Sequence, residues 1–193
     1  MGDRRPDARE SHRRTLDGFS VVVRAVPATQ WDAPSPCDEW DAQAVVEHVI
    51  GFHEFLLLRP LGVRAHRPRT GPAARWLATE TAISGVLEDP TALARDVEFF
   101  DGVRRRPAEV LLSLATDTLV HTWDLARAVG VVRALDPELC RLAYDDARSA
   151  GEARARSGLY APEVSVDASA PAQDRLLGLL GRDPSWRPSR APR

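Results

Sequence analysis

Several segments of this chain carry apolar residues at every third or fourth position, and this feature constrains the fold most. Such spacing places the apolar side chains on one face of a helix, which then packs against other helices. The first segment runs from about Ser11 to Val26 and ends before Pro27. Further helices are predicted at residues 41–58, 72–87, 107–130, 137–151 and 171–180. Together these segments predict an all-α fold, a bundle of four or more helices.

The segments between the helices have their own signals. Asp41 is suited to cap the second helix, because its carboxylate can accept from the unpaired amides of the first turn. Residues 59–71 are rich in Arg, Pro and Gly and predict a loop. Residues 97–102 are ambiguous and compatible with an extended conformation. The alternation at Val164 and Val166 predicts a short strand or extended segment near the C-terminus.

The length of 193 residues fits one large domain or two small ones. We expect residues 11–186 to form a single helical bundle. The polar residues 1–10 and the Pro- and Arg-rich residues 187–193 are expected to be disordered.

The composition excludes several classes of function. With 26 basic and 28 acidic residues the net charge is -2, and no half of the chain is strongly basic, so we expect no nucleic-acid partner. All basic residues are Arg, which removes Lys chemistry such as Schiff-base formation. The longest apolar runs, such as Phe55–Leu58, are too short to cross a bilayer, and the N-terminus lacks the apolar core of a secretory signal. We therefore expect a cytoplasmic protein with no membrane partner.

The helix predicted over residues 107–130 has two polar residues in its apolar stripe. Asp117 and His121 lie one turn apart and on the same face. An ionised carboxylate facing a core costs several kcal/mol, roughly, unless something compensates its charge. A divalent cation would do so, and this spacing lets both side chains reach one ion. The alternative is an internal salt bridge between the two residues.

His48 faces the interior from the second helix, and helical bundles build metal sites from such inward residues. Two imidazoles and one carboxylate favour zinc, nickel or ferrous iron over magnesium or calcium. Three protein ligands leave coordination positions open, as in catalytic rather than structural zinc sites. The sequence thus indicates a metal site at His48, Asp117 and His121. A hydrogen-bonded core histidine is the alternative for His48.

Other polar residues are further candidates for the site. Asp124 is a rival carboxylate to Asp117; the alternative is that it pairs with Arg127 or caps a neighbouring loop. His53 is expected at the surface or its boundary, because five residues separate it from the inward His48. His12 and His66 lie in polar contexts and carry little signal.

The cysteines and several arginines are further candidates. Cys37 and Cys140 are expected to be reduced thiols. No His lies near Cys37 in sequence to activate it, so a buried structural role is favoured over a nucleophile. Trp40 and Trp123 are expected to pack in the core. The arginines that could recognise a carboxylate of a substrate or thiol cofactor are Arg154, Arg156 and Arg182.

Two helical motifs carry a resemblance to a known superfamily. The segments PCDEWDAQAVVEHV (residues 36–49) and DTLVHTWDLARAVG (residues 117–130) resemble signatures of the DinB-like and mycothiol-dependent maleylpyruvate isomerase superfamily. The ending GLYAPEVSVDASAPAQDRLLGLLGRDP (residues 158–184) is similar to an actinobacterial metal-binding subgroup of it. The resemblance implies a DinB-like four-helix bundle that holds one metal ion through His48, Asp117 and His121. The corresponding motif of the isomerase itself resembles Glu-x-x-x-His, whereas this chain has Asp117 at the position of the Glu.

The resemblance also implies a function. We expect a metal-dependent enzyme that uses a low-molecular-weight thiol, similar to mycothiol, for isomerisation, conjugation or transfer on a small electrophilic substrate. Zinc is the metal favoured, with nickel and iron as alternatives. The second hypothesis is a non-catalytic metal-containing protein of the same fold that binds a small molecule. A di-iron carboxylate bundle is set aside, because no Glu lies three residues before His48 or His121. The sequence does not determine the oligomeric state, and a homodimer is one alternative.

Overall fold

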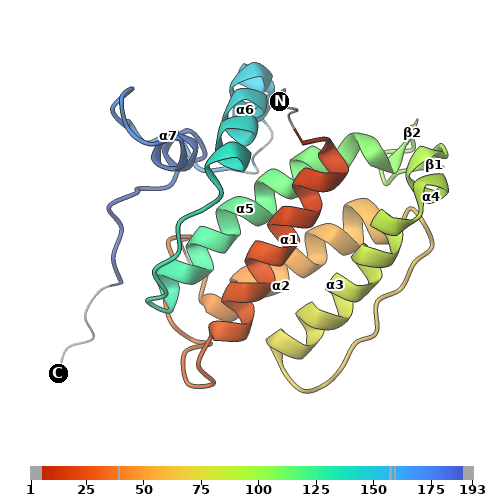
Figure 1. Cartoon of the computed structure of the whole chain (residues 1–193), viewed down its shortest axis with the longest axis horizontal. Coiled ribbons are helices and arrows are strands. Elements are labelled where there is room, and N and C mark those ends of the chain that lie inside the picture. The colour runs from red at the N-terminus through yellow and green to blue at the C-terminus, as the bar shows by residue number, and fades with distance from the viewer. Residues whose placement is uncertain (1–5, 39, 157, 159, 189–193) are drawn as a thin grey trace, which may run out of the picture.

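The computed structural model describes residues 6–188 except 39, 157 and 159, and the side chains of residues 153–155 lie outside the description. Four helices form a bundle in Figure 1: α1 (Ala8–Ala25), α2 (Ala42–His53), α3 (Pro72–Glu88) and α5 (Leu111–Ala128). Both α1 and α2 pack against α3 and α5, so the four helices enclose one core. The predicted all-α four-helix bundle is confirmed.

The start of α1 differs from the sequence analysis. Asp7 caps this helix by accepting from the Glu10 amide, and the helix therefore begins at Ala8. Residues 1–10 were expected to be disordered, but the residues just before Ser11 are helical. Residues 1–5 of that segment, and residues 189–193 of the expected C-terminal tail, lie outside the described residues. The cap predicted at Asp41 is confirmed, because its carboxylate accepts from the Ala44 amide.

The region between α2 and α5 is less regular than predicted. The second helix continues beyond His53 as a π-helical turn, η1 (Glu54–Leu58), and residues 59–71 form the expected loop. An unpredicted short helix, α4 (Pro90–Ala94), follows α3. Two short strands, β1 (Val97–Glu98) and β2 (Arg104–Arg105), then pair antiparallel. The helix expected from Pro107 begins as a 3-10 turn, η2 (Pro107–Val110), before α5.

A second cluster of apolar residues joins the C-terminal part to the bundle. It contains Leu119, Val120 and Trp123 of α5 together with residues of α6 (Pro137–Arg156) and α7 (Ala172–Leu179). In Figure 1 these two helices lie to one side of the bundle. Since α6 packs on both α5 and α7, the outer face of α5 is covered and this helix becomes the centre of the molecule.

The segment before α7 is extended and forms no strand within its described residues. It runs against α7, where the Val164 amide donates to the Gly178 carbonyl at 2.9 Å. A Cβ atom on Gly178 would meet Val166 Cγ2 at 2.4 Å, so this close approach requires glycine.

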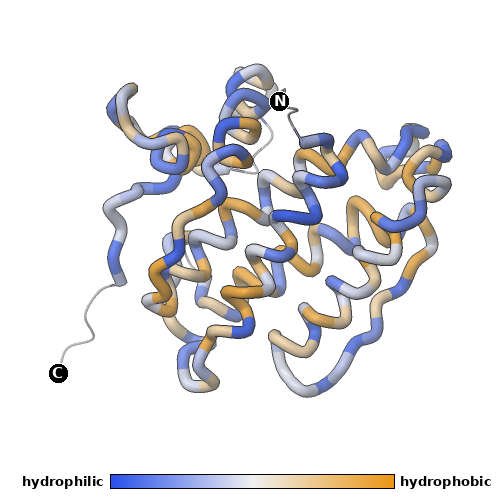
Figure 2. Tube along the Cα trace, viewed as in Figure 1, coloured by the Kyte–Doolittle hydropathy of each residue, from blue (hydrophilic) through white to orange (hydrophobic). Residues whose placement is uncertain are grey.

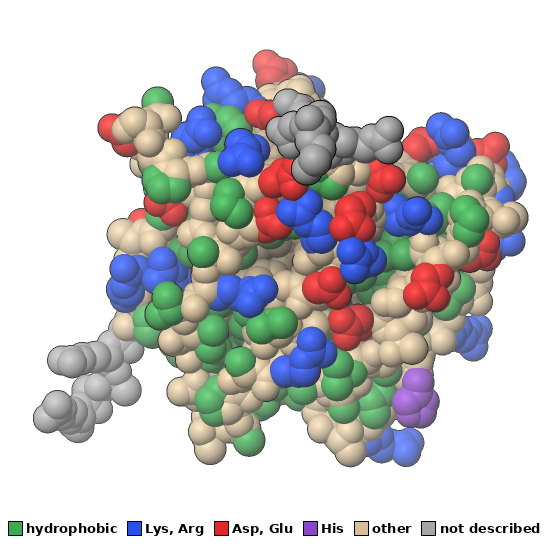
Figure 3. All heavy atoms as spheres, in the orientation of Figure 1, with side chains coloured by type: hydrophobic (Ala, Val, Ile, Leu, Met, Phe, Trp, Pro, Cys, Tyr) green, Lys and Arg blue, Asp and Glu red, His purple; other side chains and the backbone are tan. Residues whose placement is uncertain are grey.

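In Figure 2, apolar and polar residues alternate along the helices. Acidic and basic side chains are interspersed on the face shown in Figure 3. Among the described helices, none has both the length and the apolar character needed to span a membrane.

Candidate metal centre

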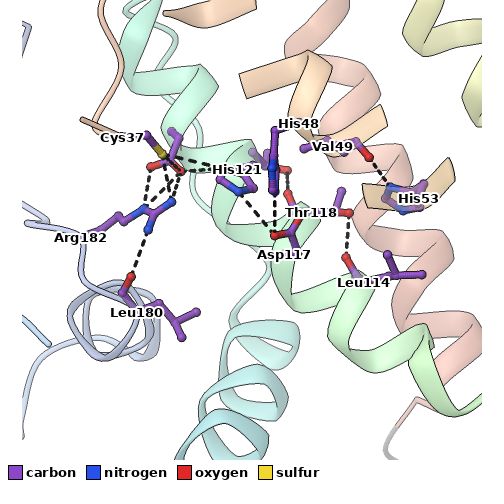
Figure 4. A network of polar contacts seen from close by, with 12 residues as sticks. Cys37, His48, Val49, His53, Leu114, Asp117, Thr118, His121, Leu180 and Arg182 are labelled. Atoms are coloured by element: carbon purple, nitrogen blue, oxygen red, sulfur yellow. Dashed lines mark hydrogen bonds and ion pairs between the residues drawn. The ribbon is translucent and has the colours of Figure 1, made fainter. Parts of the chain in front are cut away.

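The three residues predicted to share a metal ion come together at the centre of the bundle (Figure 4). His48 extends from α2, and Asp117 and His121 extend from neighbouring turns of α5. Asp117 Oδ1 lies 3.2 Å from His48 Nε2 and 3.5 Å from His121 Nε2. One ligand atom from each residue lies within 4.8 Å of the other two. The fold therefore gathers the two imidazoles around one carboxylate oxygen.

The surroundings of this carboxylate combine deep burial with one open side. Asp117 and His121 are buried, whereas the side chain of His48 keeps 28% of its surface exposed. The neighbouring hydroxyl groups do not serve Asp117, since Thr118 and Thr122 donate to backbone carbonyls one turn earlier. His48 is therefore the most exposed of the three residues.

The hydrogen bonding of Asp117 Oδ2 tests whether a cation fits here. This oxygen is buried and has no hydrogen-bond partner among the described residues. Buried carboxylate oxygens normally have partners, so an orphaned one indicates a missing positive group. Two imidazole nitrogens and a carboxylate are also the donor set of many catalytic zinc sites. The residues present thus fit a divalent metal ion.

Electrostatics keep the two residues on α5 charged in the absence of a cation. Burial alone would raise the pKa of Asp117, but His121 and His48 outweigh it and hold this pKa well below its usual value. Burial alone would lower the pKa of His121, but the carboxylates of Asp117 and Asp124 raise it well above its usual value. The centre is therefore built for a positive charge beside Asp117.

Asp124 does not pair with Arg127, contrary to the sequence analysis. Its Oδ2 lies 2.9 Å from His121 Nδ1 and 3.0 Å from Arg182 Nη2, while Arg127 stacks over the Trp123 ring. Asp124 and Asp117 thus contact opposite nitrogens of the same imidazole. Asp124 is therefore not a rival ligand on the side of His48.

The environment of Cys37 is also different from the prediction. Its Sγ lies 4.0 Å from His121 Nδ1 and 3.1 Å from Asp124 Oδ2, although no His is near it in sequence. Burial raises the pKa of this thiol. Cys37, His121 and Asp124 form a second group with metal-ligand spacing, but the Arg182 guanidinium already occupies that position at 3.0 Å from the sulfur. A cation would be repelled there.

A buried histidine pair corrects the expectations for His53 and His12. Both residues are fully buried, and their Nε2 atoms lie 2.9 Å apart. His53 Nδ1 lies 2.7 Å from the Val49 carbonyl and must donate to it, because a carbonyl only accepts. His12 Nε2 therefore donates to His53 Nε2, and His12 Nδ1 has no partner among the described residues.

Aromatic rings border the open side of the centre. Trp40, expected to be simple packing, lies 4.8 Å from the His48 ring and 5.7 Å from the His121 ring, measured between centroids. Phe52 stacks on His48 at 5.6 Å. Both aromatic side chains are half-buried and restrict the rotation of His48.

The remaining candidates lie away from the centre or outside the description. His66 is exposed. Arg156 forms an exposed ion pair with Glu152. The side chain of Arg154 lies outside the described residues. Cys37 and Cys140 are both free, in agreement with the expectation of reduced thiols.

The sequence model of the mycothiol maleylpyruvate isomerase N-terminal domain matches residues 12–126 of this chain. The chain belongs to this family. The matched segment includes His48, Asp117 and His121 and ends before α6.

Two proteins of Mycobacterium tuberculosis are similar to this family member over most of their length. They are "Uncharacterized protein Rv0738" of strain H37Rv and "Uncharacterized protein MT0763" of strain CDC 1551 / Oshkosh. Each is 31% identical over 186 residues, which cover 89% of this chain and 96% of the relative. No solved structure matches the chain.

Proposed function

We propose that this member of the mycothiol maleylpyruvate isomerase N-terminal domain family is a metal-dependent enzyme that uses a low-molecular-weight thiol. One divalent metal ion, zinc in the first place and nickel or iron as alternatives, would be held by His48, Asp117 and His121. The observation that supports this best is the orphaned Oδ2 of Asp117 beside two imidazoles. The family name, which refers to mycothiol and to an isomerase, supports the choice of thiol chemistry.

The residues of the centre have separate tasks in this proposal. Asp117 compensates the charge of the ion in the dry interior, and His121 holds it from the same helix. His48, the most exposed of the three, borders the path by which a thiol or substrate enters. The rings of Trp40 and Phe52 both lie against His48 and help to exclude water.

A bound divalent metal lowers the pKa of a coordinated thiol and so supplies a nucleophile at neutral pH. We propose a small electrophile as the substrate, such as an activated alkene or an epoxide. Addition of the thiol would lead to isomerisation or conjugation, depending on how the substrate is held.

Metal analysis of the purified protein tests the first half of the proposal. We expect close to one ion per chain in the wild type and loss of most of it in His48→Ala. His66→Ala is the matched control, because His66 is exposed and lies outside the centre. Equal metal content in all three proteins would overturn the assignment of His48.

Turnover tests the second half. The metal-loaded protein is incubated with a thiol and a panel of electrophiles, with the metal-free protein and His48→Ala in parallel. We expect conjugation or isomerisation that depends on the metal and on His48. Stoichiometric metal without turnover across the panel would favour a small-molecule-binding protein over an enzyme.

A further inference from the structure

Asp124 joins three segments of the chain that are distant in sequence. Its side chain is fully buried on α5, and Oδ2 accepts from the Cys37 thiol of the loop before α2 at 3.1 Å. The same oxygen accepts from Arg182, in the segment after α7, at 3.0 Å. In Figure 4, Cys37 and Arg182 lie on the side of His121 that faces away from Asp117. A buried carboxylate with several donors is fixed in position.

The bond between Asp124 and His121 defines the orientation of the imidazole. His121 Nδ1 lies 2.9 Å from Asp124 Oδ2, and an ionised carboxylate only accepts, so Nδ1 carries the proton. His121 Nε2 is thereby directed toward Asp117 and His48. A carboxylate behind a metal-ligating histidine fixes the ring and its tautomer in this way.

Arg182 is itself held rigidly. Its Nε and Nη2 groups bond the Asp124 carboxylate, Nη2 also bonds Cys37 Sγ, and Nη1 donates to the Leu180 carbonyl at 3.1 Å. The preceding Gly181 has a φ of +80°, and a Cβ atom there would lie 2.6 Å from the Ala161 carbonyl oxygen. Most of the guanidinium is therefore engaged, and little of it is available for a substrate carboxylate.

We propose that Arg182 is a positioning residue of the metal centre, acting on His121 through Asp124. This inference rests on the proposed metal site. It makes the C-terminal segment part of the centre, although this segment lies beyond residues 12–126, which the family model matches. Arg182 neutralises Asp124, and Asp124 then fixes the His121 ring so that Nε2 meets the ion. Loss of Arg182 leaves Asp124 free to turn or to take up a proton, and His121 loses its orientation.

The test compares four variants with the wild type. Arg182→Met removes the charge and the forked donor, whereas Arg182→Lys keeps the charge. Asp124→Asn keeps the shape of the side chain but removes the carboxylate, which leaves the Arg182 guanidinium without its counterion. Arg175→Met is the matched control, because Arg175 lies on α7 over the Tyr144 ring and has no contact with Asp124. Circular dichroism identifies variants that fail to fold.

The first readout is zinc affinity, measured by competition with a chromophoric chelator. We expect the dissociation constant to rise roughly 10- to 100-fold in Arg182→Met and in Asp124→Asn. Arg182→Lys should recover part of the loss, and Arg175→Met should stay within about twofold of the wild type. The absorption spectrum of the cobalt-substituted protein should shift in the first two variants, since the ligand field depends on the orientation of His121. Wild-type affinity and spectrum in both Arg182→Met and Asp124→Asn would overturn the proposal, as would an equal loss in Arg175→Met.

A second readout does not need the metal. In the metal-free protein, exchange of the His121 Nδ1 proton with water is followed by NMR. We expect slow exchange in the wild type and exchange at least about tenfold faster in Arg182→Met, because its acceptor is no longer fixed. If the wild type binds none of zinc, nickel and iron, the proposed function is wrong, and the exchange rates alone decide whether Arg182 orients His121. Equal exchange in both proteins would refute that orientation.

Discussion

His48 Nε2 and Asp117 Oδ1 lie 3.2 Å apart although 69 residues separate them in the sequence. The contact exists only because α2 and α5 pack side by side in the bundle. It places the partly exposed His48 against the buried carboxylate of Asp117. We therefore expect the strength of the proposed metal binding to depend on the length and charge of the side chain at position 117.

Substitution of Asp117 tests this dependence. Asp117→Asn keeps the shape but removes the charge that compensates a cation in the interior, and we expect zinc affinity to fall by more than about 100-fold. Asp117→Glu supplies the residue type found in the isomerase that the motif resembles, and binding should persist within about tenfold. Competition titrations measure both constants. Wild-type affinity in Asp117→Asn would show that the ion is held elsewhere.

Cys37→Ala tests which of two groups of possible ligands holds the metal, the one with Cys37 or the one with His48, since both include His121. Cys37 lies on the Nδ1 side of His121, away from His48, and its position is shared with the Arg182 guanidinium. We therefore expect close to one zinc ion per chain in this variant. Elemental analysis checks the stoichiometry, with His48→Ala as the contrasting variant. Metal lost from Cys37→Ala and retained in His48→Ala would move the site to the other side of the ring.

The His12–His53 pair predicts a loss of stability in acid. Burial lowers the pKa of His12 well below its usual value and also lowers the pKa of His53. Below about pH 6.5 the unfolded chain binds protons that the folded pair does not, so the free energy of unfolding falls by up to about 1.4 kcal/mol per pH unit for each histidine.

Urea denaturation of the metal-free protein between pH 7 and pH 5 measures this slope. The double variant His12→Leu/His53→Leu replaces both partners by apolar groups and should flatten it. His121 and Asp117 are unchanged in the double variant, so the comparison cancels their contribution. His66→Leu is the control for an exposed histidine and should keep the wild-type slope. A double variant with the full wild-type slope would exclude the pair as its cause.

Substitution of Gly178 tests how tightly the C-terminal segment packs against α7. In Gly178→Ala the new Cβ would lie 2.6 Å from the Val164 carbonyl oxygen, and we expect a loss of about 1 to 3 kcal/mol from the forced displacement. Gly85→Ala in α3 is the control, since no atom lies within 4 Å of its added Cβ. This control should be neutral or more stable by up to about 1 kcal/mol. Thermal unfolding distinguishes the two, and equal stability would mean that the segment yields easily.

The bundle could be predicted because its signals are local. Apolar periodicity, prolines at helix starts and the Asp41 cap each depend on a few neighbouring residues. The inward position of Asp117 and His121 follows from their place in the stripe of one helix. The sequence indicates that His48 faces inward, but its approach to these two residues requires the packing of two helices.

The partners of Asp124 could not be predicted, because Cys37 and Arg182 lie 87 and 58 residues away from it. His53 was misplaced for a different reason. The sequence pattern of the second helix predicts one buried face, whereas α2 packs against both α3 and α5. A residue that points away from His48 is consequently buried as well.

The contact of Arg182 with Asp124 determines how much of the chain the bundle needs in order to fold. A chain cut after residue 126 would retain all three candidate ligands, yet Asp124 would lose the Arg182 guanidinium and keep only the His121 imidazole as a partner in a dry interior. Such a fragment has to admit water along α5 or protonate the acid, and either outcome costs stability. Unfolding of the last helix and opening of the interior of the bundle are thus coupled, and the chain is expected to melt as one cooperative unit.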